Sequence, residues 1–256
     1  MSLLAVDIGN SHTFVGLLDG EEVTAHWRVN SDERRTADEW SVLLRGLLAE
    51  RFDDVDGVAL CATVPAVLHE WREMLERHLG GVSAIVVEPG VRTGIPVLMD
   101  NPREVGTDRI VNSLAAAELY GGPAIVVDFG TATTFDVVNG KGQYVGGAIS
   151  PGIEISLEAL GRRGAQLRKV ELARPRSVIA KNTVEALQSG MVFGVAAQVE
   201  GLVARMIAEL GVSPDDVTVI STGHLAALVV DDCECFTEHS PWLTLQGLRL
   251  VFERNS

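Results

Sequence analysis

Two short segments carry the residue types best suited to binding phosphate or metal ions, and they resemble each other. Residues 6–14 read Val-Asp-Ile-Gly-Asn-Ser-His-Thr-Phe and residues 127–135 read Val-Asp-Phe-Gly-Thr-Ala-Thr-Thr-Phe, so five of the nine positions are identical. Each segment follows an apolar run typical of a buried strand and precedes an Asp-Gly or Asn-Gly pair typical of a hairpin turn. One Asp-x-Gly segment alone would indicate only a common turn. The paired copies favour a duplicated strand–turn–strand unit.

The chemistry that such a unit supports is phosphate binding. Gly9 and Gly130 permit a tight turn and a close approach of the backbone to a ligand. Backbone N–H groups and hydroxyls around the turns can face anionic oxygens, while Asp7 and Asp128 can hold a metal ion or its waters. All three lysines lie outside the two segments, and the chain has no G-x-x-x-x-G-K-[ST] motif. The pattern therefore disfavours a P-loop and indicates that metal ions and backbone dipoles meet the phosphate charge.

The composition narrows the class of protein. The net charge of −14 disfavours nucleic-acid binding through a basic face. Three cysteines cannot build a disulfide framework, which predicts a reducing compartment; Cys61 is expected in the core, and Cys233 and Cys235 lack the second pair that a zinc site needs. The sequence offers no signal peptide and no run of membrane-spanning length. We expect a soluble, cytoplasmic protein with no nucleic-acid or membrane partner.

The elements that must position these segments alternate between strands and helices. We expect strands near 3–7, 13–18, 23–29, 58–64, 83–87, 124–128, 134–138, 143–149 and 217–220, and helices near 40–48, 66–79, 101–120, 183–210 and 244–253. Asp19-Gly20 predicts a hairpin turn, because a type I′ turn needs positive φ at its centre, and Asn139-Gly140 predicts a second hairpin turn. An irregular stretch is expected over 162–181. Gly121-Gly122-Pro123 predicts a boundary between a domain over 1–120 and a domain over 121–256.

Several motifs resemble those of one protein superfamily. Asp7-Ile-Gly-Asn-Ser and Asp128-Phe-Gly-Thr-Ala-Thr-Thr resemble the two phosphate motifs of the actin/sugar-kinase/Hsp70 ATPases, and residues 219–226 are similar to the adenosine motif. Within that superfamily, residues 101–109, 146–152 and 243–249 resemble type III (CoaX-type) pantothenate kinases. The resemblance implies an α/β fold of two tandem ribonuclease-H-like (actin-like ATPase) domains, with mixed sheets flanked by helices and a cleft between them.

The resemblance also implies an activity. Such a kinase would transfer the ATP γ-phosphate to the primary hydroxyl of pantothenate, giving 4′-phosphopantothenate in the first step of coenzyme A biosynthesis. ATP, Mg²⁺ and a monovalent cation (K⁺ or NH₄⁺) would take part, in a homodimer with pantothenate bound near the interface. Two alternatives remain open: a non-catalytic regulatory protein of the Bvg accessory factor type, and a kinase of another small hydroxylated acceptor.

Site residues follow from the same resemblance. It implies Asp108 as the catalytic base, Asp128 as the ligand of the monovalent cation, and Asp7 as a contact of Mg²⁺ through phosphate or water. ATP would be bound by Asp7, Ile8, Gly9, Asn10, Ser11, His12, Thr13, Phe14 and Thr131, and substrate by Met99, Gly106, Thr107, Asp108, Arg109 and Thr183.

Other interpretations of some of these residues compete with the resemblance. Without the motif, Asp108 and Arg109 would indicate an ordinary surface pair on a helix, and Asn182-Thr183 also fits a helix N-cap. Met99 stands where many members have a substrate-binding Tyr, and His224 stands where a Gly-Gly pair is common. We expect the long apolar stripe over 184–210 to be core or dimer interface.

Overall fold

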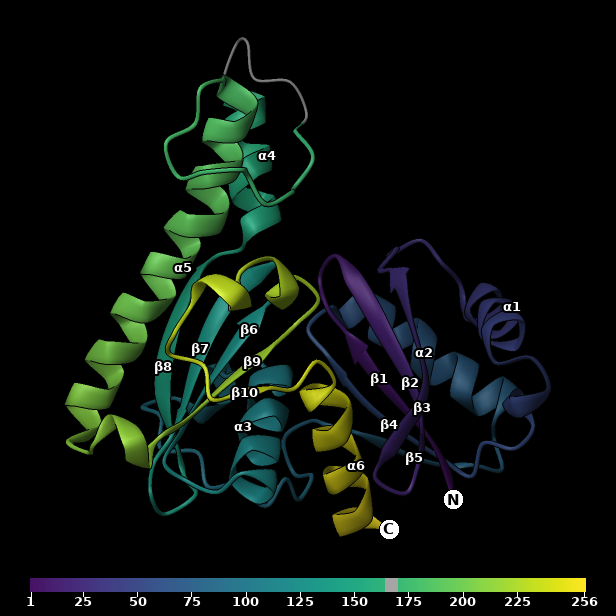
Figure 1. Ribbon diagram of the computed structural model, residues 1–256. Coiled ribbons are helices and arrows are strands. Elements are labelled where there is room, and N and C mark those ends of the chain that lie inside the picture. The colour runs from purple at the N-terminus through teal and green to yellow at the C-terminus, as the bar shows by residue number, and fades with distance from the viewer. Residues whose placement is uncertain (164–169) are drawn as a thin grey trace. The chain divides into compact units, whose positions relative to one another are not determined.

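The computed structural model describes residues 1–163 and 170–256, which form two compact units (Figure 1). Unit 1 comprises Met1–Ile95, Asp100–Ala115 and Trp242–Ser256, and unit 2 comprises Pro96–Met99 and the described residues of Ala116–Pro241. Each unit contains one five-stranded sheet.

Unit 1 is a mixed sheet with helices. Its strands are β1 (Ser2–Ile8), β2 (His12–Asp19), β3 (Glu22–Asn30), β4 (Gly57–Ala62) and β5 (Ser83–Val86), in the order β3-β2-β1-β4-β5. Its helices are α1 (Ala37–Leu48), α2 (Pro65–His78), α6 (Leu243–Asn255) and the first part of α3 (Thr107–Leu119). The first three strands are antiparallel, whereas β4 and β5 are parallel to β1.

Helices α1 and α2 pack against one face of this sheet. Leu4, Val6 and Ile8 of β1 join a buried cluster with Trp40 of α1 and Trp71 of α2, whose rings lie 5.1 Å apart. Packing of such large apolar side chains supplies most of the free energy of folding. The same interdigitation fixes the angle at which these helices lie on the sheet.

Helix α6 packs on β2 and β4 in unit 1. A Cβ on Gly16 would lie 2.5 Å from Leu245 Cδ1, and one on Gly57 would lie 2.4 Å from the Phe252 ring. Glycine at these two strand positions is what lets the helix approach so closely. The predicted boundary assigned this helix to the second half, whereas its contacts place it in unit 1.

Unit 2 repeats the topology of unit 1. Its strands are β6 (Ala124–Phe129), β7 (Ala132–Val138), β8 (Tyr144–Pro151), β9 (Thr218–Thr222) and β10 (Glu238–His239), in the order β10-β9-β6-β7-β8. Again three antiparallel strands are extended by two parallel ones. This correspondence, in which β1 and β6 are both central, confirms the predicted duplication. The helices of unit 2 are α4 (Ile153–Arg163), α5 (Thr183–Leu210) and the end of α3.

Helix α5 is capped at both ends by residues of its own sequence. Asn182 caps its N-terminus by accepting from the Glu185 N–H at 2.9 Å, and Gly211 ends it in the left-handed conformation at φ 68°. In the part of the chain that is described, α5 is the one helix long and apolar enough to cross a membrane by length and composition alone. The expectation that no run reaches this length was therefore wrong, although Val192, Val199 and Val203 pack in the core of unit 2.

Most elements lie where the sequence predicts them, with three exceptions. Helix α4 and strand β10 were not predicted. The helix expected from 101 starts at Thr107, because Pro102–Glu104 form a separate 3-10 turn and Val105 is extended at φ −76°, ψ 126°.

Both predicted hairpins form, but neither turn is type I′, which needs two residues with positive φ. At the first, Gly20 has φ 58° and no other residue of the turn has positive φ. At the second, Gly142 rather than Gly140 has positive φ, and Asn139 Oδ1 accepts from the backbone N–H groups of Lys141 and Gln143. The asparagine thus builds a longer turn through its side chain.

Candidate active site

The turn of the first hairpin follows the carboxyl end of β1, the central strand of unit 1. Gly9 N–H donates to the His12 carbonyl at 3.1 Å and closes the turn. A Cβ on Gly9 would lie only 3.0 Å from that oxygen, which accounts for glycine at this position. Asn10 and Ser11 are exposed at the tip, whereas the side chains of Ile8 and Thr13 are fully buried. Of the predicted ATP contacts, Ile8 and Thr13 therefore offer a ligand their backbone only.

Ser31 is a residue of this turn that the sequence did not indicate. Its Oγ donates to the Gly9 carbonyl at 2.6 Å and shares a 2.9 Å hydrogen bond with Thr13 Oγ1, and its N–H donates to the Ser11 carbonyl at 3.0 Å. Ser31 follows β3, two strands away from β1 in the chain. Its contacts depend on the β2–β3 register, so no local pattern could have revealed them.

Asp7 lies beside the terminal residues of the neighbouring parallel strand. It pairs in register with Cys61 of β4, whose Sγ donates to Asp7 Oδ1 at 3.4 Å. Burial, followed by the nearby carboxylates of Asp7 and Asp108, raises the pKa of the Cys61 thiol well above its ordinary value. The thiol is therefore a neutral hydrogen-bond donor. Asp7 and Asp108, predicted separately from the sequence, both lie close enough to act electrostatically on this one side chain.

Asp108 lies in the first turn of α3 and is held there by its neighbours. Thr107 Oγ1 donates to the Ala62 carbonyl at 3.3 Å, which fixes the helix start against the end of β4. A Cβ on Gly106 would lie 2.4 Å from Asp108 Oδ1, so glycine makes room for the carboxylate. This geometry differs from the ordinary surface pair that Asp108 and Arg109 would otherwise indicate.

The electrostatics of Asp108 suit a proton acceptor. Its Oδ1 is buried and, among the described residues, has no hydrogen-bond partner. Burial raises the pKa of this carboxyl above its usual range, and this effect exceeds the opposing influence of the Arg109 backbone N–H and charge. A carboxylate with a raised pKa is a stronger base than an ordinary aspartate.

The second hairpin ends β6 in unit 2, and two glycines enclose it. Gly130 N–H donates to the Ala132 carbonyl at 3.0 Å, and Gly152 N–H donates to the Thr131 carbonyl at 3.1 Å. A Cβ on Gly152 would lie 2.3 Å from that Thr131 oxygen. Gly223, at φ 89°, follows β9 and approaches so closely that a Cβ there would lie 2.4 Å from Asp128 Oδ1. Asp128 and Thr131 are thus packed between the turns after β8 and β9.

A buried polar network supports this hairpin from behind. Thr134, the register partner of Asp128, donates from Oγ1 to Asp136 Oδ2 at 3.1 Å, and the Tyr144 hydroxyl donates to Asp136 Oδ1 at 3.0 Å. Asp136 and Tyr144 are both fully buried. Networks of this kind fix one arrangement of the strands because each buried polar group needs its partner.

The two departures from the family pattern have definite surroundings. Met99 belongs to a segment that runs along β8, where Leu98 N–H donates to the Tyr144 carbonyl at 2.8 Å. A Cβ on Gly146 would lie 3.4 Å from Met99 Sδ, so the thioether packs over the strand. The His224 side chain is 10% exposed, and its Nε2 lies 3.9 Å from Glu154 Oε2 of α4. His224 therefore contacts a helix instead of leaving open space beside the turn.

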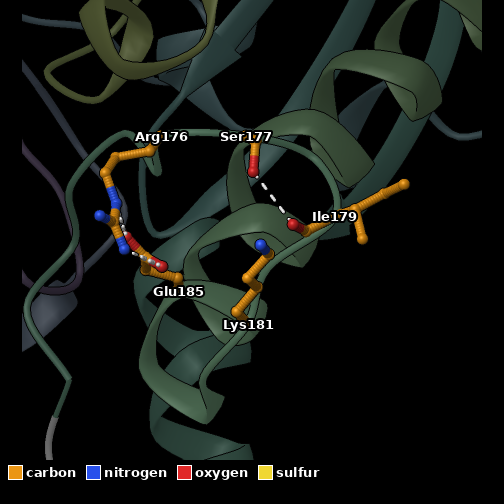
Figure 2. Close-up of a pocket in the computed structure, with 5 residues that line it drawn as sticks. All are labelled: Arg176, Ser177, Ile179, Lys181 and Glu185. Carbon is orange, nitrogen blue, oxygen red and sulfur yellow. Dashed lines mark hydrogen bonds and ion pairs between the residues drawn. The ribbon is translucent and has the colours of Figure 1, made fainter.

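Thr183 is exposed and is the first residue of α5. Lys181 and Glu185, two residues before and after it in the sequence, line a surface pocket of about 260 Å³ (Figure 2). The pocket is lined by Arg176, Ser177, Ile179, Lys181 and Glu185. Within it, Arg176 donates to Glu185 and the Ser177 hydroxyl donates to the Ile179 carbonyl at 3.0 Å. The charges on its wall are thus partly paired with each other.

The comparisons with known proteins identify the family. The model for type III pantothenate kinases matches residues 3–205. A type III pantothenate kinase from Nocardioides sp. is 75% identical, with all of both chains covered. The chain belongs to the type III pantothenate kinase family. Another relative of that name, from Streptomyces griseus, is 64% identical over 99% of this chain and 98% of its own.

Solved structures support the fold assigned to this family member. The activator of 2-hydroxyisocaproyl-CoA dehydratase from Clostridium difficile superimposes with a TM-score of 0.56 at 12% identity, covering 100% of this chain and 96% of its own. A ROK hexokinase from Thermus thermophilus gives 0.54 at 16%, covering 100% and 99%. These similarities confirm the predicted actin-like ATPase and sugar-kinase fold, with two mixed sheets flanked by helices.

Proposed function

We propose that this protein is an ATP-dependent pantothenate kinase that transfers the γ-phosphate to the primary hydroxyl of pantothenate and forms 4′-phosphopantothenate, the first step of coenzyme A biosynthesis. The observation that carries the proposal is 75% identity, over the whole of both chains, to a protein named type III pantothenate kinase. The duplicated hairpins and the buried Oδ1 of Asp108 agree with it.

In unit 1, Asp108 accepts or orients the hydroxyl proton of pantothenate. Phosphoryl transfer passes through a loose transition state, so orienting the hydroxyl contributes at least as much as removing its proton. Arg109, with the Gly106–Thr107 backbone, binds the substrate and offers its guanidinium to the pantothenate carboxylate. Met99 and Thr183 are the other two proposed substrate contacts.

The nucleotide is bound by residues 7–14 of the first hairpin and by Thr131 of the second. The partly exposed Asp7 carboxylate fits Mg²⁺, which prefers oxygen ligands and retains its waters. When bound, Mg²⁺ offsets the charge of the phosphates. Asp128, enclosed by turn backbone, offers oxygen ligands that suit K⁺ or NH₄⁺. Asp7 and Asp128 would hold these ions and keep the phosphates oriented.

We also place the protein in the cytoplasm as a homodimer. The exposed apolar side chains at the start of α5 and just before it support the homodimer: Val178 is 65% exposed, Ile179 85% and Val184 49%. Apolar side chains grouped this way typically mark an interaction surface. A second copy of this chain, bound over the first turns of α5, would cover them.

A direct assay tests the proposed activity. Purified protein is supplied with ATP, Mg²⁺ and pantothenate, with and without K⁺, and ADP release is followed beside Asp108→Ala. We expect ADP release that depends on pantothenate, rises with K⁺ and is lost in the variant. Nucleotide binding without turnover would favour the regulatory alternative, and turnover only with other alcohols would favour the other-acceptor alternative.

A further inference from the structure

We propose that Cys61 is a positioning residue for the metal–nucleotide site: its thiol orients the Asp7 carboxylate. The importance of Asp7 rests on the proposed kinase function, whereas the contact itself belongs to unit 1 alone. None of the motifs discussed above includes Cys61.

The register of the sheet brings the two side chains together. β1 and β4 are parallel, with Asp7 opposite Cys61, and the Cys61 Sγ lies 3.4 Å from Asp7 Oδ1. Cys61 is fully buried, yet it is absent from the cluster around Trp40 and Trp71 to which its neighbour Leu60 belongs. Since successive side chains of a strand point to opposite faces, Cys61 shares a face with Asp7 and not with that cluster.

Neighbouring contacts show that this end of the sheet is held by side chains. Thr63 Oγ1 donates to the Ile8 carbonyl at 3.2 Å, and Thr107 Oγ1 donates to the Ala62 carbonyl at 3.3 Å. The Cys61–Asp7 contact lies one residue earlier on each strand than Ile8 and Ala62. Together the three contacts tie β1, β4 and the start of α3, the elements that carry Asp7 and Asp108.

The chemistry of a thiol suits this task. A neutral S–H group is a weak donor, so it orients a carboxylate without neutralising it. A lysine or arginine at the same place would pair with Asp7 and compete with a metal cation for the carboxylate. A serine would place a stronger hydroxyl donor on the same Cβ, with a smaller atom and a shorter bond, whereas valine would fill the space without a donor.

These substitutions separate positioning from packing, because the two roles predict opposite orders. If Cys61 only fills space, Cys61→Val resembles the parent and Cys61→Ser is the more damaged. If it orients Asp7, Cys61→Ser resembles the parent and Cys61→Val is the more damaged. Cys61→Ala removes the donor without adding bulk, in case valine prevents folding. Cys233→Val, at a partly buried thiol of unit 2, controls for cysteine replacement in general.

The readout is the Mg²⁺ concentration that gives half-maximal binding of a non-hydrolysable ATP analogue, measured by isothermal titration calorimetry on the full-length protein, with the melting temperature recorded beside it. We expect the parent, Cys61→Ser and Cys233→Val to agree within about twofold, and Cys61→Val and Cys61→Ala to need about threefold to fivefold more Mg²⁺, the effect of losing one weak hydrogen bond.

The inference is overturned if Cys61→Val and Cys61→Ala match the parent, or if Cys61→Ser is as impaired as they are. Absence of Mg²⁺-dependent nucleotide binding in the parent also overturns it. If the parent binds nucleotide in this manner but does not phosphorylate pantothenate, the proposed substrate is wrong while the Cys61 comparison still stands on binding.

Discussion

Replacing Asp108 by asparagine removes a carboxylate but keeps its size and shape. Asp108 Oδ1 is buried without a hydrogen-bond partner among the described residues, and the pKa of the carboxyl is raised by burial. Loss of a positioned general base typically lowers a rate by about 10² to 10⁴. Because the transition state of phosphoryl transfer is loose, we expect the lower end, about 100-fold in kcat or about 2.7 kcal/mol.

The same substitution has an effect on stability whose sign follows from the pKa. The folded-state pKa lies above the ordinary value of 3.8, so ionisation of Asp108 costs the parent stability as the pH rises through that value and beyond. Asparagine does not ionise. Asp108→Asn should therefore melt higher than the parent at pH 7, and this difference should shrink as the pH falls and be absent below pH 3.8.

Initial-rate kinetics and thermal melts across pH measure both effects. In the parent, the acid limb of the pH–rate profile should report a pKa above 3.8. Glu209→Gln, the same change at an exposed acid of α5, is the control and should alter neither quantity appreciably. A variant that keeps more than a third of the parental rate would refute the role as base. A variant that melts lower than the parent at pH 7 would refute the reasoning from burial.

Three further predictions concern the surroundings of the site. Gly223→Ala should weaken nucleotide binding at least tenfold and lower the melting temperature, because its Cβ would lie 2.4 Å from Asp128 Oδ1 at φ 89°; calorimetry that shows parental affinity would contradict this. Tyr144→Phe should cost about 1–3 kcal/mol in chemical denaturation, because it removes a donor to the buried Asp136, and an unchanged midpoint would count against it. Cys61 should resist a thiol reagent until the protein unfolds, since its pKa is raised and its side chain is inaccessible, whereas the partly exposed Cys235, whose pKa is lowered by its hydrogen bond with Cys233, should react in the folded state; equal labelling rates at Cys61 and Cys235 would contradict this.

Much of the fold followed from the sequence because its signals are local. Alternation and helical spacing located most strands and helices, and the repeat of residues 6–14 at 127–135 predicted the topology that β1–β2 and β6–β7 share. Helix α4 and β10 were missed. β10 has two residues and depends on pairing with β9 rather than on a pattern of its own.

The site was predictable only where a motif carried it. Asp7 and Asp108 were named from separate motifs, but their common neighbour Cys61 depends on the parallel β1–β4 register, which a sequence does not show. Ser31 depends on tertiary contacts in the same way. Helix α6 appeared to belong with the residues before it, and only its packing on Gly16 and Gly57 assigns it to unit 1.

Phosphorus NMR of the product tests the central claim most directly. The full-length protein is incubated with ATP, Mg²⁺, K⁺ and pantothenate, and the new phosphomonoester signal is recorded with proton coupling. Transfer to the primary hydroxyl predicts a triplet, because that phosphate couples to the two protons of one methylene group. It also predicts one ADP for each product and about 100-fold less product from Asp108→Asn over the same time. A doublet, no new phosphomonoester, or equal product from the variant would contradict the account.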